Sequence, residues 1–372
     1  MTAAHFPGKL AIQQRVLTPY RGLFFDALAQ ACAGGLSVCA GLPRPEESIA
    51  VANELRFANY TFTKNVHFFR GPFYLCYQSG LTDWLSTVDP DALILEANPR
   101  YLATPATVRW MKRRSRPLLG WGLGAPATST ALRFLGKWGE IQQRAFVHQF
   151  DALITYSRRG ADQYAALGSP ADKIFVAPNA AAPRPTQPMP PRPPAFDGKP
   201  GVLFVGRLQA RKRVDLLLQA CAALPANLQP RLVIVGEGPE RESLQATAGK
   251  VYPSAVFTGA KHGAELAPYF SAADLFVLPG TGGLAVQEAM SYGLAIIMGQ
   301  GDGTNDDLVR PGNGWQIPAD DLPALTETLR TALAEVGRLR AMGAESYRIV
   351  AEEINLEKMV GVFVEALNQL SK

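Results

Sequence analysis

Short apolar runs alternate with longer amphipathic segments along most of the chain. The runs are rich in Val, Ile and Leu, a composition typical of strands buried on both faces of a parallel sheet. We expect strands at residues 10–13, 36–40, 92–95, 117–119, 152–155, 174–177, 202–205, 232–235, 275–278, 295–297 and 315–317. Helical spacing predicts helices at residues 23–33, 104–114, 144–150, 159–167, 322–336 and about 338–371. This alternation predicts an α/β fold whose helices cover both faces of a parallel sheet.

The pattern is interrupted once, at residues 180–200, which hold eight prolines among 21 residues. Such a composition is typical of a semi-rigid connector between domains. We therefore expect a first domain at residues 1–180, a linker at 181–200 and a second domain at 201–350. A final helical segment at 351–372 completes the chain.

The composition fits two soluble cores and no membrane span. The length of 372 residues and the hydrophobic content of 47% favour two domains. No apolar run reaches the roughly 18–20 residues that a membrane span needs, and the first nine residues lack the apolar region of a signal peptide. The four cysteines have no metal-ligand spacing, so we expect reduced thiols, no metal site and a cytoplasmic protein.

Charge is distributed unevenly between the halves. Residues 1–180 contain 19 Lys and Arg against 12 Asp and Glu, a balance of +7, and the remainder contains 18 against 20. A basic half indicates an anionic partner. Nucleic acid is not expected, because no aromatic-interleaved basic helix or known recognition motif is present.

Two glycine-containing turns between a strand and a helix carry the candidate chemistry. After the run 202–205 come Gly206, Arg207 and Lys212, then a helix. A strand, a glycine turn, cations and a helix start are the arrangement that holds a phosphate group, although a plain turn with solvated cations has the same pattern. The second turn follows the run 275–278, and it combines ligand-accessible backbone with an acidic residue one helical turn further on. Its candidate residues are Gly280, Gly282, Gly283, Leu284 and Glu288.

Together these stretches resemble the retaining, GT-B-fold glycosyltransferases of family 4, also described as glycosyl transferases group 1. The matching features are Gly206-Arg207-Leu208 with Lys212, a Gly-acid-Gly-Pro turn at 236–239, a strand and turn at 256–259, and Glu288 with Gly293. The resemblance is close over residues 200–320 and looser before them. It implies two Rossmann-like domains that face each other across a cleft, and a last helix that crosses back to the first domain.

The resemblance also implies roles for the site residues. Arg207 and Lys212 would stabilise the leaving diphosphate with the backbone N–H groups of Gly283 and Leu284, so no metal ion or other cofactor is expected. Glu288 would contact the ribose and Lys261 would face the base. Solvated side chains are the alternative for Glu288 and Lys261, and Arg211 and Arg213 are interpreted as solvent-exposed.

Two positions depart from the family pattern. The family has a sugar-binding Glu eight residues before Glu288, where this chain has Gly280. That change predicts an atypical donor sugar, unless another group such as Asp302 supplies the contact. No His follows the strand at 117–119, where family members often place one, so no general base is assigned.

The acceptor side is predicted only from its position after strands of the first domain. Polar side chains follow the first strand and the strand at 92–95, and the residues are Tyr20, Arg21, Glu96, Asn98 and Arg100. A capped helix start explains such residues equally well.

The leading functional hypothesis is transfer of a sugar from a nucleotide sugar to a sugar or lipid-linked acceptor, in polysaccharide or glycolipid synthesis. A nucleotide-sugar epimerase and an inactive nucleotide-binding partner protein remain alternatives. Four cations close a helix pattern of the first domain at Lys112, Arg113, Arg114 and Arg116. They favour peripheral contact with the anionic cytoplasmic face of a membrane, or else they only complement the helix dipole.

Overall fold

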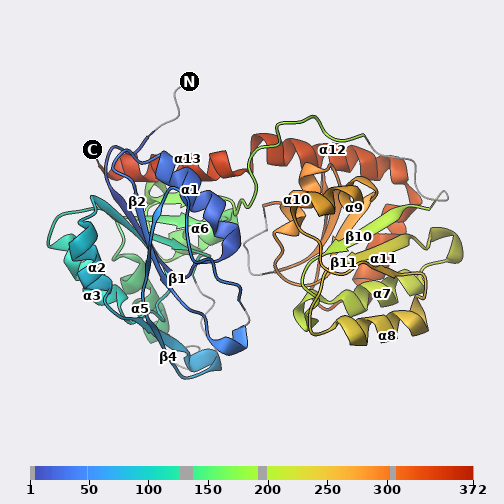
Figure 1. Ribbon diagram of the computed structural model, residues 1–372, viewed down its shortest axis with the longest axis horizontal. Coiled ribbons are helices and arrows are strands. Elements are labelled where there is room, and N and C mark those ends of the chain that lie inside the picture. Colours follow the sequence, from blue (N-terminus) through green and yellow to red (C-terminus); the bar gives the residue numbers. More distant parts are fainter. Residues whose placement is uncertain (1–4, 48, 126–136, 192–198, 302–306, 372) are drawn as a thin grey trace. The chain divides into compact units, whose positions relative to one another are not determined.

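The computed structural model describes residues 5–47, 49–125, 137–191, 199–301 and 307–371. The chain divides into two compact units (Figure 1). The first unit comprises Met1–Ala181 and Leu356–Lys372, and the second comprises Ala182–Asn355. Each unit has its own parallel sheet and its own core, which confirms the α/β fold with two Rossmann-like units.

The first unit is built on a seven-stranded sheet in the order β3-β2-β1-β6-β7-β8-β9, with every neighbouring pair parallel. The strands are β1 (Leu10–Val16), β2 (Leu36–Gly41), β3 (Asn59–Phe62), β6 (Ala92–Glu96), β7 (Leu118–Gly122), β8 (Ala152–Thr155) and β9 (Ile174–Val176). The chain enters at β1, builds to one side through β2 and β3, and resumes on the other side at β6. Ligands in open parallel sheets bind outside the carboxyl ends of the strands at such a reversal.

Helices surround this sheet, and a helix from the far end of the sequence completes its core. They are α1 (Gly22–Gln30), α2 (Leu81–Val88), α3 (Thr104–Lys112), α5 (Lys137–Val147), α6 (Arg158–Ala166) and α13 (Leu356–Leu370). Phe363 of α13 lies with its ring centre 4.9 Å from those of Phe24 and Trp121. The buried face of α13 therefore belongs to the core of the first unit, as the family resemblance implied.

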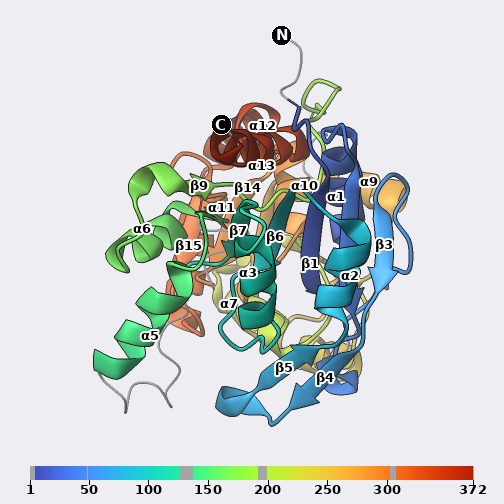
Figure 2. The ribbon, with the colours of Figure 1, turned by 90° about the vertical axis from the view of Figure 1, so that its left-hand side faces the viewer.

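A small two-stranded antiparallel ribbon accompanies the large sheet and was not predicted from the sequence. It consists of β4 (Asn65–Phe68) and β5 (Leu75–Gln78), and Figure 2 shows it apart from the parallel strands. The strand β3 was also missed, because only its neighbour β2 has a continuous buried apolar run.

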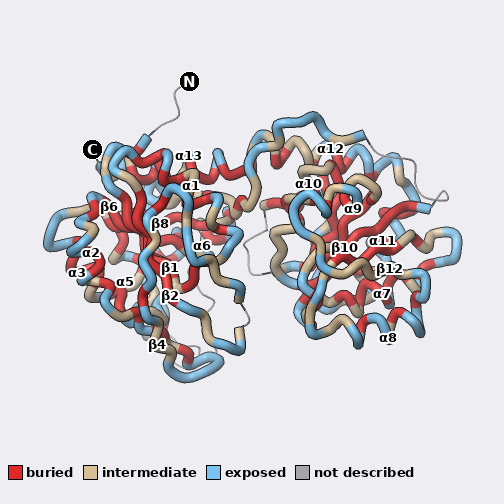
Figure 3. The backbone as a smooth tube through the Cα atoms, viewed as in Figure 1, coloured by how far each residue is buried: buried red, intermediate tan, exposed pale blue. Residues whose placement is uncertain are grey.

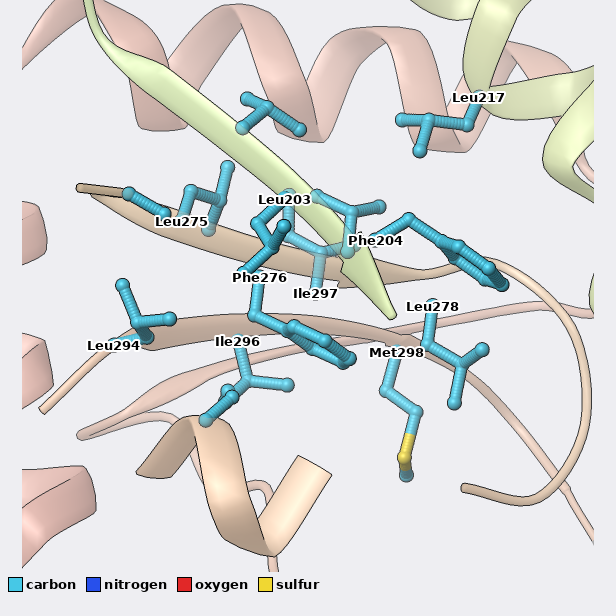
Figure 4. Packing of buried hydrophobic residues seen from close by; sticks show 14 of the residues in the cluster. Leu203, Phe204, Leu217, Leu275, Phe276, Leu278, Leu294, Ile296, Ile297 and Met298 are labelled. Carbon is cyan, nitrogen blue, oxygen red and sulfur yellow. The ribbon is translucent and has the colours of Figure 1, made fainter. Parts of the chain in front are cut away.

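The second unit has a six-stranded parallel sheet in the order β12-β11-β10-β13-β14-β15. The strands are β10 (Gly201–Val205), β11 (Arg231–Val235), β12 (Val256–Phe257), β13 (Leu275–Leu278), β14 (Ala295–Gly299) and β15 (Gly314–Ile317). The helices are α7 (Val214–Ala223), α8 (Arg241–Val251), α9 (Ala267–Ser271), α10 (Ala285–Ser291), α11 (Leu322–Ala334) and α12 (Val336–Glu352). Figure 4 shows side chains of three neighbouring strands, among them Phe204, Phe276 and Ile297, packed in this core. Here too the chain order reverses beside the first strand, between β10 and β13.

The prediction of one continuous helix over about 338–371 is wrong, because the helix is broken between α12 and α13. The buried side chain of Asn355 donates its amide hydrogens to the carbonyl oxygens of Val350 (3.0 Å) and Ala351 (3.2 Å). An asparagine side chain that binds these carbonyls satisfies the end of one helix and competes with its continuation. The break allows the two helices to pack on different cores.

The described part of the proline-rich segment packs on the second unit. The hydroxyl of Tyr347 on α12 donates to the carbonyl oxygen of Gln187, and Met189 lies against Gly293. Residues 182–191 therefore behave as an outer layer of the second unit in addition to connecting the units.

Candidate active site

The two glycine-containing turns meet at the carboxyl ends of β10 and β13. The first forms the single 3₁₀ turn η6 (Ala210–Lys212), and the second is the glycine loop, residues 279–284. The backbone N–H of Gly280 donates to the carbonyl oxygen of Lys212 (3.2 Å), and that of Thr281 donates to Arg211 (3.1 Å). These two backbone hydrogen bonds thus join segments that lie about 70 residues apart in the sequence.

The side chain of Lys212 adds a second connection between the same segments. It is buried, with 6% of its surface exposed, and its Nζ donates to the carbonyl oxygens of Thr281 (2.8 Å) and Gly282 (2.7 Å). A buried ammonium needs such acceptors because its desolvation is costly. The predicted phosphate-binding lysine therefore also holds the glycine loop in place.

Arg211 lies beside Lys212, where the sequence had suggested only a solvated side chain. Its Nη1 donates to the carbonyl oxygen of Thr281 at 3.4 Å, and it lies 3.5 Å from the position that a Cβ on Gly282 would occupy. The arginine is exposed, as expected, but it faces the glycine loop. Its position next to Lys212 in a tight turn is the signal that could have identified it.

Gly280 has no room for a side chain. A Cβ at this position would lie 2.0 Å from the carbonyl oxygen of Arg211 and 2.6 Å from the Cα of Lys212. Contacts this short do not occur between real atoms, so the loop reaches its position against η6 only because residue 280 is glycine. Asp302, the sequence-based substitute for the missing carboxylate, lies outside the described residues.

Glu288 lies in the first turn of α10 and is half-buried. Burial raises the pKa of its carboxyl group. Among the described residues no hydrogen bond or ion pair to this carboxylate is found, so its oxygens are available to a hydroxyl donor. The N–H groups of Val286 and Gln287 donate to the carbonyl oxygens of Gly283 (3.4 Å) and Leu284 (3.2 Å), so the first turn of α10 begins directly after the glycine loop.

The remaining donor-side predictions have weaker support. Arg207 is exposed in the loop after β10, next to Gly206, whose N–H donates to the carbonyl oxygen of Val235 (3.0 Å). Lys261 lies 3.9 Å from Glu265 in a partly exposed pair, which matches the alternative of a surface side chain. Arg213 pairs with Asp215 and Asp320, so this arginine is committed to local ion pairs.

Arg21, predicted on the acceptor side, is enclosed in the first unit. Its Nη2 donates to the hydroxyl of Tyr156 (2.9 Å), and its guanidinium lies 4.9 Å from the ring centre of Trp121 and 5.3 Å from that of Tyr20. Only 6% of its surface is exposed. The geometry gives Arg21 a packing role, whereas its neighbour Tyr20 is 41% exposed.

Glu96 lies at the reversal point of the first sheet, at the end of β6. Its Oε2 accepts the N–H of Arg15 (3.0 Å) from the end of β1, and its own N–H donates to Oε1 of Gln13 (3.2 Å). Burial raises the pKa of the Glu96 carboxyl, although hydrogen bonds from Arg15 and Tyr101 oppose the shift. The sequence analysis missed these partners, because Gln13 and Arg15 look like ordinary strand residues.

The two other acceptor-side predictions are Asn98 and Arg100, which follow β6. Asn98 Oδ1 accepts the N–H of Arg100 at 3.1 Å, so Asn98 forms a local turn, whereas the alternative expected from the sequence was a capped helix start. Next to this turn is a small hollow of about 10 Å³, room for about one water, and polar side chains lie on its wall. The lining includes Gln13, Arg15, Asn65, Gln78 and Tyr101.

Within the described residues, no group of three or more His, Cys, Asp or Glu side chains is arranged to hold a metal ion. The helices of the described residues include none that is both long and apolar enough to span a bilayer.

Comparisons with known proteins match part of the chain to a family. Residues 199–335 match the family described as Glycosyl transferases group 1. A GDP-mannose-dependent alpha-mannosyltransferase of Mycobacterium tuberculosis is 38% identical over 168 residues, which is 42% of each chain. The sulfoquinovosyl transferase SQD2 of Arabidopsis thaliana is 37% identical over 143 residues, 36% of this chain and 27% of that one. The similarity thus spans less than half the length of these curated relatives.

Solved structures match over nearly the whole chain. A lipopolysaccharide outer core galactosyltransferase, WaaB, has a TM-score of 0.70 at 15% identity, and the match covers 97% of this chain and 99% of that one. The Anabaena protein HepE in complex with UDP has a TM-score of 0.67 at 14% identity, with the same coverage. Identities this low establish the fold alone. The resemblance found in the sequence is therefore confirmed over residues 199–335, which match glycosyl transferases group 1, and the chain has the GT-B fold.

Proposed function

We propose that this protein is a retaining glycosyltransferase that transfers a sugar from a nucleoside diphosphate sugar to a hydroxyl acceptor, in polysaccharide or glycolipid synthesis. The observation that carries the proposal is the junction of Lys212 and Arg211 with the glycine loop at the reversal point of the second sheet. Two cations beside ligand-accessible backbone form a site for a diphosphate.

The donor that we propose first is GDP-mannose. Three relatives that share 36–42% identity with this chain over 33–42% of its length are GDP-mannose-dependent alpha-mannosyltransferases from three bacteria, whereas a fourth relative in this range is the sulfoquinovosyl transferase. UDP-glucose is the second choice, because HepE has been solved with that ligand and has the same fold. Gly280 keeps open the alternative of an atypical sugar, since a carboxylate that would bind far hydroxyls of a common hexose has no room there.

The proposed reaction needs no metal ion. As the bond between sugar carbon C1 and the diphosphate oxygen breaks, negative charge develops on the leaving diphosphate. Lys212, Arg211 and Arg207 would stabilise that charge, and each preorganised donor of this kind is typically worth about 3–4 kcal/mol. The acceptor hydroxyl would attack from the face that the diphosphate leaves, so the leaving oxygen takes its proton and no separate general base is required.

Lys212 would exchange partners during this cycle. Without a donor its ammonium binds the carbonyl oxygens of Thr281 and Gly282. A diphosphate oxygen is a stronger acceptor than a carbonyl because the hydrogen bond is charge-assisted. We therefore propose that donor binding releases part of the glycine loop from Lys212, while Glu288 accepts hydrogen bonds from the ribose hydroxyls.

The test is a panel of nucleotide sugars assayed for binding by thermal shift and for product by mass spectrometry, with and without EDTA. We expect GDP-mannose to raise Tm and to be consumed in the presence of EDTA. Complete loss of activity in EDTA, restored by Mg²⁺, would contradict the metal-independent mechanism. Isomerisation of the donor without any acceptor would identify an epimerase instead.

A second candidate, an inactive nucleotide-binding protein, is favoured by one observation. The position of the missing sugar-binding carboxylate is closed by the contact between Gly280 and Arg211. This candidate predicts that GDP and GDP-mannose bind equally well and that no donor of the panel is turned over.

We also propose that the protein contacts an anionic membrane surface, as an enzyme with a lipid-linked acceptor would. The basic group at the end of α3 supports this less than its sequence suggested. Arg116 donates to Asp89 Oδ1 and to the carbonyl oxygen of Pro90, and the guanidinium of Arg114 lies 3.8 Å from the ring centre of Trp110. Two of the four cations are thus engaged within the first unit.

A further inference from the structure

The ribbon of β4 and β5 directs its apolar face outward and its polar face inward, the reverse of the usual arrangement. Residues on one face of a strand alternate, and the register places Val66 opposite Tyr77 and Phe68 opposite Leu75. This apolar face is directed outward, since Phe68 is 40% exposed and Tyr77 is 43% exposed. The face directed inward carries Asn65, His67, Cys76 and Gln78.

Hydrogen bonds of the inward face fix this orientation. Asn65 Nδ2 donates to the carbonyl oxygens of Arg15 (2.7 Å) and Leu42 (2.9 Å). The amide of Gln78 accepts from Gln13 (2.9 Å) and donates to the carbonyl oxygen of Gln14 (3.1 Å). A slip of the ribbon by one residue would break these bonds and expose the inward face, so the outward apolar face is a specified feature.

The turn that joins the two strands is also apolar and exposed. Phe69 and Phe73 have 69% and 66% of their surface accessible to solvent. Phe69 has a φ of 57°, in the left-handed region that bulky residues rarely adopt. Backbone strain of this kind collects at functional positions, and here it displays an aromatic ring to solvent.

A third segment extends the same surface. The N–H of Cys76 donates to the carbonyl oxygen of Arg100 (3.0 Å), and the N–H of Leu102 donates to that of Cys76 (2.9 Å). Residues 100–102 therefore run beside β5 and add Leu102, which is 45% exposed. Residues 65–78 are called the aromatic arm below, and residues 68–73 at its turn are exposed, which is the pale blue of the tube in Figure 3.

The segment that contains the aromatic arm carries cations and no carboxylate. Residues 56–82 contain Arg56, Lys64 and Arg70 and no Asp or Glu. Glu46 is a carboxylate from outside this segment, and its Oε1 lies 3.7 Å from Nε of Arg70. A second copy of this arm would bring like charges together, whereas an anionic surface would pair with them.

We propose that the aromatic arm docks the protein on an anionic lipid bilayer. The inference gives a location to the membrane contact proposed above and rests on that part of the proposed function. Phenylalanines and a tyrosine flanked by lysine and arginine are the side chains that bind at a bilayer interface, where the rings enter the headgroup boundary and the cations meet lipid phosphates. Several adjacent exposed rings are unfavourable on a surface that contacts only water, because each ring leaves apolar area in water.

The first test is vesicle co-sedimentation of the full chain without donor or acceptor. Vesicles of phosphatidylcholine with 30–40% phosphatidylglycerol, about the charge density of an anionic leaflet, are compared with pure phosphatidylcholine over a salt series. We expect the double variant Phe69→Asn/Phe73→Ser to bind the anionic vesicles at least about tenfold more weakly than the unchanged protein. Asparagine tolerates the left-handed conformation at position 69, so the fold should survive, and Tm is measured for each variant.

The matched control removes two exposed aliphatic side chains elsewhere in the first unit. Leu23 and Ile141 are 58% and 61% exposed, and Leu23→Ser/Ile141→Ser should bind vesicles as the unchanged protein does. Two further double variants distinguish the aromatic arm from the end of α3. Lys64→Gln/Arg70→Gln should weaken vesicle binding, whereas Lys112→Gln/Arg113→Gln should not.

A second measurement reports the environment of the arm itself. The four cysteines are free and buried, so Phe73→Cys can be labelled selectively with an NBD fluorophore. Its emission should rise and shift to the blue with anionic vesicles, while a label at Ile141→Cys stays as in water.

Three results would overturn the proposal. The first is that Phe69→Asn/Phe73→Ser leaves vesicle binding unchanged. The second is that an NBD label at position 73 remains in water when the protein is bound to vesicles. The third is that the unchanged protein forms a dimer that Phe69→Asn/Phe73→Ser abolishes. The last result would assign the surface to a second copy of the chain. Loss of turnover with intact vesicle binding would contradict the transferase function and leave this proposal standing.

Discussion

The Nζ of Lys212 lies 2.7 Å from the carbonyl oxygen of Gly282, and 2.8 Å from that of Thr281. The lysine therefore joins the two segments that form the candidate donor site, in addition to carrying the charge that a diphosphate requires. If the same ammonium also binds the diphosphate, as proposed, removal of this side chain should loosen the glycine loop and weaken the donor site together.

The first prediction concerns Gly280. Gly280→Ala should lower the free energy of unfolding by about 1–3 kcal/mol, because the added Cβ would meet the carbonyl oxygen of Arg211 at 2.0 Å. Gly249→Ala in α8 is the matched control, since a Cβ there meets nothing within 4 Å, and it should be neutral or slightly stabilising. Urea denaturation compares the two. Equal stability of both variants would show that the loop is not held against η6.

A related variant tests the donor specificity. Gly280→Glu introduces the carboxylate that family members carry, but the loop must move to accept it. We therefore expect this variant to be less stable and not to gain activity on a common hexose donor. A gain in activity would show that the loop opens easily and that the missing carboxylate alone limits the donor range.

The second prediction concerns Arg21 in the first unit. Arg21→Ala should lower the free energy of unfolding by about 2–4 kcal/mol, because it leaves a cavity between Trp121 and Tyr20 and removes the partner of the half-buried Tyr156 hydroxyl. Arg113→Ala, at an exposed position after α3, should change stability by no more than about 0.5 kcal/mol. If Arg21 serves only an acceptor, its removal would change turnover and leave the unfolding curve where it was.

The third prediction is a pH dependence. Burial raises the pKa of Glu288 in the folded protein above its ordinary value of 4.5. The folded state then binds this proton more tightly than the unfolded state does, so the stability from this group is present at low pH and is lost as pH rises through the folded pKa. Glu288→Gln is neutral at every pH. Relative to the unchanged protein it should gain stability between about pH 4 and pH 8, measured by urea denaturation at both values.

Nucleotide binding gives the same variant a second readout. Ribose hydroxyls that donate to the charged carboxylate should bind more weakly to Glu288→Gln, by about tenfold at pH 8, because such hydrogen bonds are worth about 1.5–3 kcal/mol. Glu242→Gln, an exposed change in α8, is the control and should bind GDP normally. Unchanged affinity in Glu288→Gln would exclude the ribose contact.

The parallel sheets could be predicted from the sequence because strands buried on both faces have continuous apolar runs. The run at 202–205 lies in β10, whose first four residues are buried, and its neighbours β11 and β13 are equally clear. The arm of β4 and β5 could not be predicted in this way. Its apolar residues face outward and its polar residues inward, so the usual rule for assigning faces fails there.

Candidate site residues could be selected from the sequence where they lie near one another, whereas contacts that join distant segments could not be predicted. Lys212 and Glu288 were selected from local patterns, whereas the bonds from Lys212 to the glycine loop depend on the sheet order. The enclosure of Arg21 depends on Trp121 and Tyr156, which are 100 and 135 residues away. The end of α12 at Asn355 was missed because its amide binds carbonyls inside a segment that is otherwise helical.

The most direct test of the central claim is the turnover of GDP-mannose in EDTA by the unchanged protein, by Lys212→Ala and by the control Lys250→Ala, an exposed change in α8. Circular dichroism and Tm establish that each variant is folded. The account predicts metal-independent turnover that falls by about two to three orders of magnitude in Lys212→Ala and is unchanged in Lys250→Ala. Full activity of folded Lys212→Ala would contradict the account.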